Sequence, residues 1–96
     1  MISPLISYGQ WIQKSSLPSE ARHHPVTMSH NNIGYLLTGA TDNGYVNDFY
    51  SYEPTTDSWS QLTDFPGETR AYAMGGANSS HLFIGFGVDD TESYFN

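Results

Sequence analysis

The stretch that decides the fold runs from Asn47 to Trp59 and reads NDFYSYEPTTDSW. Side chains alternate between the two faces of an extended strand, so Phe49 and Tyr50 are expected on opposite faces. Pro54 ends this strand and sets a turn, because proline fixes its own backbone angle and has no amide hydrogen. Trp59 follows the turn, within a second short segment that is expected to be extended, Ser58–Leu62. The stretch therefore predicts two short strands joined by a tight turn.

The chain repeats itself around this stretch at an offset of 48 residues, which separates Trp11 from Trp59. Further identical pairs at this offset are Gln13 and Gln61, Pro18 and Pro66, Glu20 and Glu68, Arg22 and Arg70, Gly39 and Gly87, and Asp42 and Asp90. The offset then becomes 49, as Asn47 and Asn96 show, because the loop after Gly87 has one extra residue. A period of ~40–50 residues with β-type composition is typical of propeller blades.

We expect short strands throughout, because short apolar runs alternate with turns rich in Asn, Asp, Gly and Pro. In chain order the expected strands are Trp11–Lys14, Arg22–Ser29, Ile33–Thr38, Val46–Glu53, Ser58–Leu62, Arg70–Ala77 and Leu82–Phe86. The expected turns include His30–Asn32, Asp42–Gly44, Glu53–Asp57 and Asn78–Ser80. No segment shows helical periodicity, so the predicted fold is all-β.

These features resemble the Kelch repeat family, in its long-repeat, galactose-oxidase-like form. The segments that carry the resemblance are Tyr35–Gly39, Asn47–Trp59, Phe65–Gly67, Arg70 and Phe83–Gly87. The chain departs from the family at one point, because the double glycine of the family appears here as Thr38-Gly39 and Phe86-Gly87. Together the matching segments cover nearly the whole sequence from Trp11 onward.

The resemblance implies a Kelch-type β-propeller of about six or seven four-stranded antiparallel blades around a central channel. The first strand of each blade would line the channel, and the fourth would form the rim. The chain would supply about one complete blade and parts of two neighbours. We divide it into a non-repeat segment, 1–10, a first repeat, 11–58, and a truncated second repeat, 59–96. Because a lone blade exposes two aromatic-rich faces, its expected partners are other blades, from a longer parent chain or from further copies of itself.

Composition limits the classes of partner. Ten acidic residues face three basic ones, a formal net charge of −7, so we expect neither nucleic-acid binding nor an anionic membrane partner. The chain has no cysteine, which excludes a disulfide framework, a thiolate nucleophile and a cysteine-type zinc site. The segment 1–8 has no basic run and contains Pro4, so we expect no signal peptide there; export stays open.

Arg22 and Arg70 are the only arginines and occupy equivalent positions of the repeat. The resemblance places them where the first strand of a blade enters the channel, which makes them candidate ligand-binding residues for an anionic group. The alternative is structural: each guanidinium would donate to loop carbonyls or pair with the carboxylates of Glu20 and Glu68. We favour the structural alternative.

The other residues that the repeat marks are expected to be structural, with both tryptophans covering the contact between blades. They are Trp11, Trp59, Pro18, Pro66, Gly39, Gly87, Tyr52 and Asp57.

The histidines and loop aspartates do not predict a metal site. His23 and His24 are adjacent, and neighbours in a strand point to opposite faces, so they are not expected to share an ion. The aspartates of the loops after the two glycine-closed strands match no known calcium loop, and we expect them to be solvated turn residues. These are Asp42, Asp89 and Asp90. We expect no metal and no other cofactor.

The sequence favours binding over catalysis. No set of nucleophile, base and orienting residue is discernible, so we do not expect an enzyme. Copper chemistry of the galactose-oxidase type needs a tyrosine modified by cysteine, and the chain has no cysteine. The favoured function is a propeller segment that acts as a binding scaffold for a protein or carbohydrate ligand. Two alternatives stay open: a fragment of a Kelch-propeller enzyme, such as a sialic-acid mutarotase-like protein, and a structural spacer in a surface protein.

Overall fold

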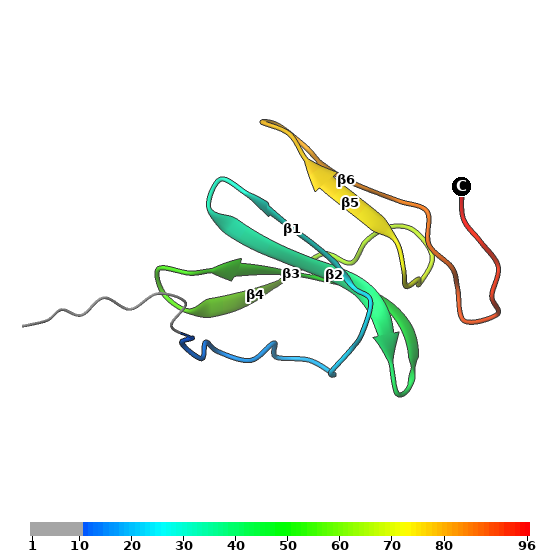
Figure 1. Cartoon of the computed structure of the whole chain (residues 1–96), viewed down its shortest axis with the longest axis horizontal. Helices are drawn as coiled ribbons and strands as arrows, with labels where there is room; N and C mark the ends of the chain where they lie inside the picture. The colour runs from blue at the N-terminus through cyan, green and yellow to red at the C-terminus, as the bar shows by residue number, and fades with distance from the viewer. Residues whose placement is uncertain (1–10) are drawn as a thin grey trace, which may run out of the picture.

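The computed structural model describes residues 11–96, which form two antiparallel β-sheets (Figure 1). The first sheet has four strands in chain order, β1 (Val26–His30), β2 (Ile33–Thr41), β3 (Gly44–Glu53) and β4 (Ser58–Leu62). The second is a hairpin of β5 (Met74–Ala77) and β6 (Leu82–Gly85). Within 11–96 no helix is long and apolar enough to cross a membrane. The all-β prediction is confirmed, with one four-stranded blade and part of the next.

The turns between strands use the residues that the sequence indicated. Asn31 and Asn32 connect β1 to β2 with φ angles of 51° and 65°, the left-handed region that asparagine tolerates better than most residues. Gly44 follows the next turn with a φ of 119°, where a side chain would be strained. Asp57, with a φ of 51°, precedes β4. The strand β4 itself has the predicted bounds.

The register of the four-stranded sheet separates two faces. We call one the hairpin face, because it packs against β5 and β6; its members include Val26, Met28, Leu37, Phe49 and Leu62. The other is the linker face, because the chain that precedes β1 contacts it; its members include Thr27, Leu36, Tyr50, Trp59 and Gln61. Phe49 and Tyr50 therefore lie on opposite faces, as the alternation in the sequence predicted.

The hairpin packs closely on the first sheet at one point. A Cβ atom added to Gly75 would lie 2.4 Å from Cγ1 of Val26, so only glycine allows β5 to approach β1 at this distance. Farther along the same contact, a cavity of about 480 Å³ is lined by Met28, Leu37 and Ile84, among others. The apolar core is small, and its buried members among residues 11–96 are Val26, Leu37, Ala40, Tyr50 and Ala71.

Two predicted strands begin later than expected. The strand predicted from Arg22 begins at Val26, and the strand predicted from Arg70 begins at Met74. The reason is the same in both repeats: His24 has a φ of 54° and Tyr72 a φ of 60°, and a left-handed residue breaks an extended strand. Before each break a single bridge joins the segment to its neighbour, between 23 and 40 and between 71 and 88.

The prediction that glycine closes the second strand is wrong in the first repeat. β2 continues through Gly39 to Thr41, because a bulge at Thr38 absorbs one residue and the ladder resumes after it. In the second repeat the equivalent residue, Phe86, has a φ of 66°, and β6 ends just before it at Gly85. Thr38 itself has a φ of 61°, so the two repeats share this local conformation.

The predicted strand Trp11–Lys14 is not formed. These residues have no strand assignment, and Trp11 is 96% exposed rather than covering a contact between blades. A rim strand is held by backbone hydrogen bonds to the third strand of its own blade, and no strand of residues 11–96 pairs with Trp11–Lys14. The segment 1–10 that was predicted to lie outside the repeat is not among the described residues.

Candidate functional site

Arg22 is buried at the start of the blade, with only 3% of its side chain exposed. Its Nη1 donates to the backbone oxygen of Thr38 at 3.1 Å, and its Nε donates to the backbone oxygen of Glu20 at 3.3 Å. Its Nη2 donates to a carboxylate oxygen of Asp48 at 3.0 Å, within an ion pair. The two backbone contacts are structural, since one acceptor lies at the bulge of β2 and the other in the segment before β1. The ionic partner is Asp48, and the proposed pairing with the carboxylate of Glu20 is wrong.

The carboxylate of Asp48 is held in its charged form by this arrangement. Burial alone would raise its pKa, but the hydrogen bond and the positive charge of Arg22 outweigh that effect. The hydroxyl groups of Tyr50 and Ser19 also donate to the carboxylate. The pKa of Asp48 therefore lies below its usual value.

Arg70 makes the equivalent backbone contacts in the second repeat. Its Nη1 donates to the backbone oxygen of Phe86 at 2.9 Å and its Nε to that of Glu68 at 3.1 Å. Its guanidinium lies over the rings of Phe65 and Phe95, 4.9 and 4.0 Å from their centroids. No carboxylate among residues 11–96 pairs with it. Both arginines thus cross-link the chain, and ligand binding by either one stays a prediction.

The glycines of the repeat stand where the chain has no room for a side chain. Gly39 has a φ of 115° and Gly87 a φ of 95°. A Cβ atom on Gly39 would lie 3.2 Å from the backbone oxygen of His23, and one on Gly87 would lie 2.8 Å from that of Ala71. The prediction that both glycines are structural agrees with this geometry.

His23 and His24 lie close together, against the expectation from strand alternation. Their Nδ1 atoms are 2.7 Å apart, because the left-handed φ of His24 breaks the alternation. The ring of His24 also stacks on that of Tyr72, with centroids 4.0 Å apart. Within residues 11–96 these two histidines gain no third metal-ligating residue.

An aromatic pair and a hydrogen-bonded carboxylate join β3, β4 and the segment before β1. Trp59 packs on Tyr52 with ring centroids 4.9 Å apart, and its Nε1 donates to the backbone oxygen of Ser15 at 2.9 Å. The carboxylate of Asp57 accepts from the Tyr52 hydroxyl at 2.6 Å and from the Ser15 amide at 2.9 Å. The hydrogen bond to Asp57 raises the pKa of Tyr52 to about 12, and the same bond lowers the pKa of Asp57.

Other predicted residues take local roles. Pro18 and Pro66 lie in equivalent bends before β1 and β5. The carboxylate of Asp89 accepts from the amides of Thr91 and Ser93, each at 2.9 Å, so it orders a loop. Hydrogen bonds from Thr91 and Ser93 hold the pKa of Asp89 below its usual range.

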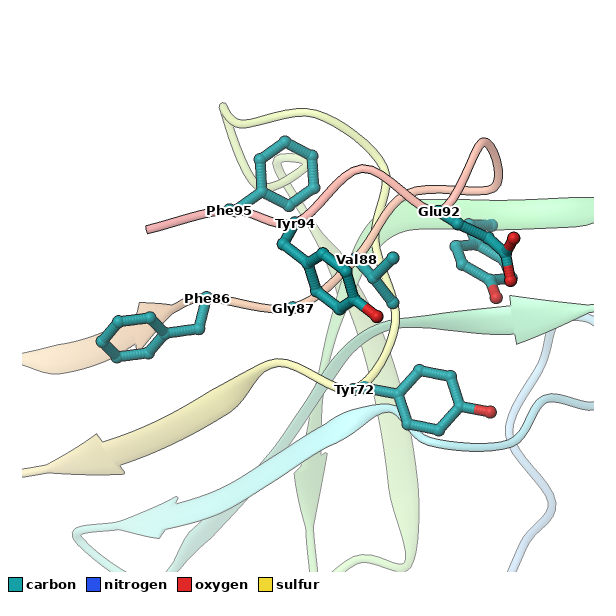
Figure 2. Close-up of a pocket in the computed structure, with 8 residues that line it drawn as sticks. Tyr72, Phe86, Gly87, Val88, Glu92, Tyr94 and Phe95 are labelled. Atoms are coloured by element: carbon teal, nitrogen blue, oxygen red, sulfur yellow. The ribbon is translucent and has the colours of Figure 1, made fainter.

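An aromatic pocket lies at the end of β6, with a volume of about 520 Å³. Its lining residues are Tyr45, Tyr72, Phe86, Gly87, Val88, Glu92, Tyr94 and Phe95. Figure 2 shows Tyr72 and Tyr94 approaching it from different segments, with Val88 beside Tyr94. Tyr94 is 84% exposed, and Tyr72 and Phe86 are about half exposed. The pocket thus combines exposed rings, tyrosine hydroxyls and one carboxylate.

No pattern in the sequence indicated this pocket as a whole. Tyr72 alone could have been suspected, because it stands two residues after Arg70, one of the two candidate ligand-binding arginines, at the repeat position that His24 has after Arg22. Tyr94 could not be recognised in this way, since its exposure depends on how the loop from Val88 to Phe95 folds over Gly87. The amide of Phe95 donates to the Gly87 oxygen at 2.9 Å and so fixes that loop.

Of the comparisons with known proteins, the one with solved structures gives a match. No family model matches the sequence, and no curated protein matches it. Among solved structures it is similar to one titled "Structure of YjhT", with a TM-score of 0.77 and 20% sequence identity. The match covers 85% of this chain and 25% of that chain. This likeness concerns the fold, and it agrees with the sheets described above: the chain has the fold of part of a β-propeller, one blade and a portion of the next.

Proposed function

We propose that this chain is a binding segment of a Kelch-type β-propeller, and that the aromatic pocket contacts the ligand. The observation that carries the proposal is the pocket lining, in which exposed aromatic rings stand beside hydroxyl groups and the carboxylate of Glu92. Its volume of about 520 Å³ falls within the usual range of ligand sites, roughly 300–1,000 Å³.

The chemistry of the lining favours a carbohydrate. A tyrosine ring offers an apolar face to the C–H groups of a sugar, while its hydroxyl exchanges hydrogen bonds with sugar hydroxyls. The Glu92 carboxylate adds an acceptor. The net charge of −7 makes a strongly acidic ligand unfavourable. A protein ligand is the second candidate, since exposed tyrosine and phenylalanine are also common in protein contacts.

A glycan array followed by calorimetric titration of the best ligand tests this proposal. Tyr94→Ala is expected to weaken binding about tenfold or more, in the range found for aromatic contact residues. Trp11→Ala is the matched control, because Trp11 is also an exposed aromatic residue but does not line the pocket. Absence of binding to any glycan, or equal loss in both variants, would count against a carbohydrate site in this pocket.

The enzymatic alternative predicts a different readout. A propeller enzyme would convert its ligand, so the bound sugar would show new resonances or faster anomer exchange in NMR spectra. The binding proposal predicts line broadening and shifts without conversion. A chain that binds no ligand at all would favour the structural-spacer alternative.

A further inference from the structure

The segment just before β1 carries two neighbouring histidines whose side chains converge. The Nδ1 atoms of His23 and His24 are 2.7 Å apart, and their ring planes are perpendicular, with centroids 4.9 Å apart. Both side chains are exposed. Neutral imidazole is the commonest metal ligand among side chains, and one ion can reach two nitrogens that lie this close together.

The backbone brings the two nitrogens together. The amide of His23 donates to the carbonyl oxygen of Ala40 at 3.0 Å, and the amide of Ala40 donates to the carbonyl oxygen of His23 at 2.9 Å. His24 then has a left-handed φ of 54°, so its ring lies on the same side of the chain as that of His23. In an extended strand the two rings would point to opposite faces. The fold therefore holds the pair together before any ion binds.

The second repeat shows that this backbone does not need histidines. The equivalents of His23 and His24 at an offset of 48 are Ala71 and Tyr72. Ala71 makes the same reciprocal bridge, to Val88, with both hydrogen bonds at 3.0 Å. Tyr72 has the same left-handed conformation, with a φ of 60°. The same local structure thus forms with alanine and tyrosine, and the geometry of the fold does not explain the histidine pair.

The separation of the two nitrogens favours one kind of ion. Two nitrogens bound side by side at about 2.0 Å lie roughly 2.8 Å apart in a square plane and roughly 3.3 Å apart in a tetrahedron. The separation of 2.7 Å matches the square plane. Cu²⁺ takes this geometry, and it binds a given set of nitrogen ligands more tightly than the other divalent ions of its row. The net charge of −7 adds a general attraction for a cation.

We propose that His23 and His24 bind Cu²⁺ through their Nδ1 atoms, with water in the remaining positions. In the free chain one ring carries its hydrogen on Nδ1, because one nitrogen must donate and the other accept. In the complex both rings carry their hydrogen on Nε2, so the change is a shift of tautomer that releases no proton. Two protein ligands are enough for this site, and residues 11–96 supply no third metal-ligating side chain to it. Neither histidine lines the aromatic pocket.

Titration of the full 96-residue chain with Cu²⁺ in a non-coordinating buffer tests this proposal. The electron paramagnetic resonance spectrum of the bound ion should show coupling to two nitrogens. His23→Ala should weaken binding at least about tenfold, since even a lost outer-shell partner of a metal costs that much. The fold accepts this change, because Ala71 makes the same bridge in the second repeat. His81→Ala removes another exposed histidine and should leave the copper affinity unchanged.

Urea unfolding with and without Cu²⁺ separates this site from an adventitious ion only. A site made by the fold binds the folded chain more tightly than the unfolded chain, so Cu²⁺ should raise the urea midpoint of the wild-type and His81→Ala chains. The midpoint of His23→Ala should not rise, and neither should that of His24→Phe, which keeps a ring against Tyr72.

Equal copper affinity in the wild-type and His23→Ala chains would overturn the proposal. A wild-type midpoint that Cu²⁺ does not raise would mean an adventitious ion only, and would overturn it too. Glycan binding measured without copper reports on the proposed function separately.

Discussion

The ring of His24 stacks on the ring of Tyr72, with centroids 4.0 Å apart and planes inclined by 25°. The two residues are 48 positions apart, which is one repeat of the sequence, and both have left-handed backbone angles. Equivalent residues of successive repeats therefore meet in space. This is the relationship expected of blades that stand side by side, each contacting only its neighbours.

The ion pair of Arg22 and Asp48 should be important for stability. Asp48→Ala leaves a buried guanidinium without its counter-charge, and the expected loss in the free energy of unfolding is about 2 kcal/mol. The value lies below that of a fully buried pair because 19% of the Asp48 side chain is exposed and Arg22 keeps its carbonyl acceptors. Urea unfolding measures the loss. Asp42→Ala is the control, because the Asp42 side chain is exposed and makes no hydrogen bond within residues 11–96.

The same ion pair predicts how the free energy of unfolding depends on pH in the acidic range. The pKa of Asp48 is lowered in the folded state, so its contribution is fully present above the unfolded value of about 3.9. The contribution is lost as the pH falls through the lower, folded pKa. The free energy of unfolding should therefore decrease below about pH 4, and Asp48→Asn should make that decrease shallower. An equally steep decrease in the variant would show that other carboxylates account for it.

The phenol of Tyr52 should titrate at a higher pH than an unperturbed tyrosine, whose pKa is about 10. Its hydrogen bond to Asp57 raises its pKa to about 12, and absorbance near the phenolate band follows the titration. Because the folded pKa is raised, the stabilising contribution is present below the unfolded value of about 10 and is lost as the pH rises through about 12. Asp57→Asn should return the Tyr52 pKa toward its usual value, whereas Asp42→Asn should not. A Tyr52 pKa that is insensitive to Asp57→Asn would contradict the hydrogen bond.

The two tryptophans of the repeat should respond differently to substitution. Trp59→Phe keeps an aromatic ring against Tyr52 but loses the hydrogen bond to the Ser15 oxygen, at a cost of about 1 kcal/mol. Trp59→Ala also loses the packing and should cost about 2–3 kcal/mol, since the ring is half-buried. Trp11→Phe should change the free energy of unfolding by less than about 0.5 kcal/mol, because Trp11 is exposed. Equal losses at both positions in chemical unfolding would contradict the difference that the structure shows.

Much of the fold could be predicted because the repeat and the turn residues act locally. The asparagines at 31 and 32 and the strand from Ser58 to Leu62 follow from short-range preferences, and the structure has them where the sequence placed them. Trp11 fails for a non-local reason. A rim strand needs a neighbouring strand for its hydrogen bonds, and the residues of one segment do not show whether another segment pairs with it.

The site residues were harder to predict because they depend on single backbone angles. The left-handed backbone angle of His24 brings its ring to His23 and Tyr72. A histidine at position 24 does not by itself predict that angle. The repeat predicts the ion pair of Arg22 and Asp48 only in part. The arginines are paired in the sequence, but the carboxylate that binds Arg22 lies 26 residues away on β3.

The stacking of successive repeats is tested most directly by nuclear Overhauser contacts between the ring protons of His24 and Tyr72. The account predicts these contacts together with those between Tyr52 and Trp59 inside the first blade. If the contacts within the blade were present and those between His24 and Tyr72 were absent, the hairpin would not stand beside the first sheet, and the propeller arrangement would be contradicted.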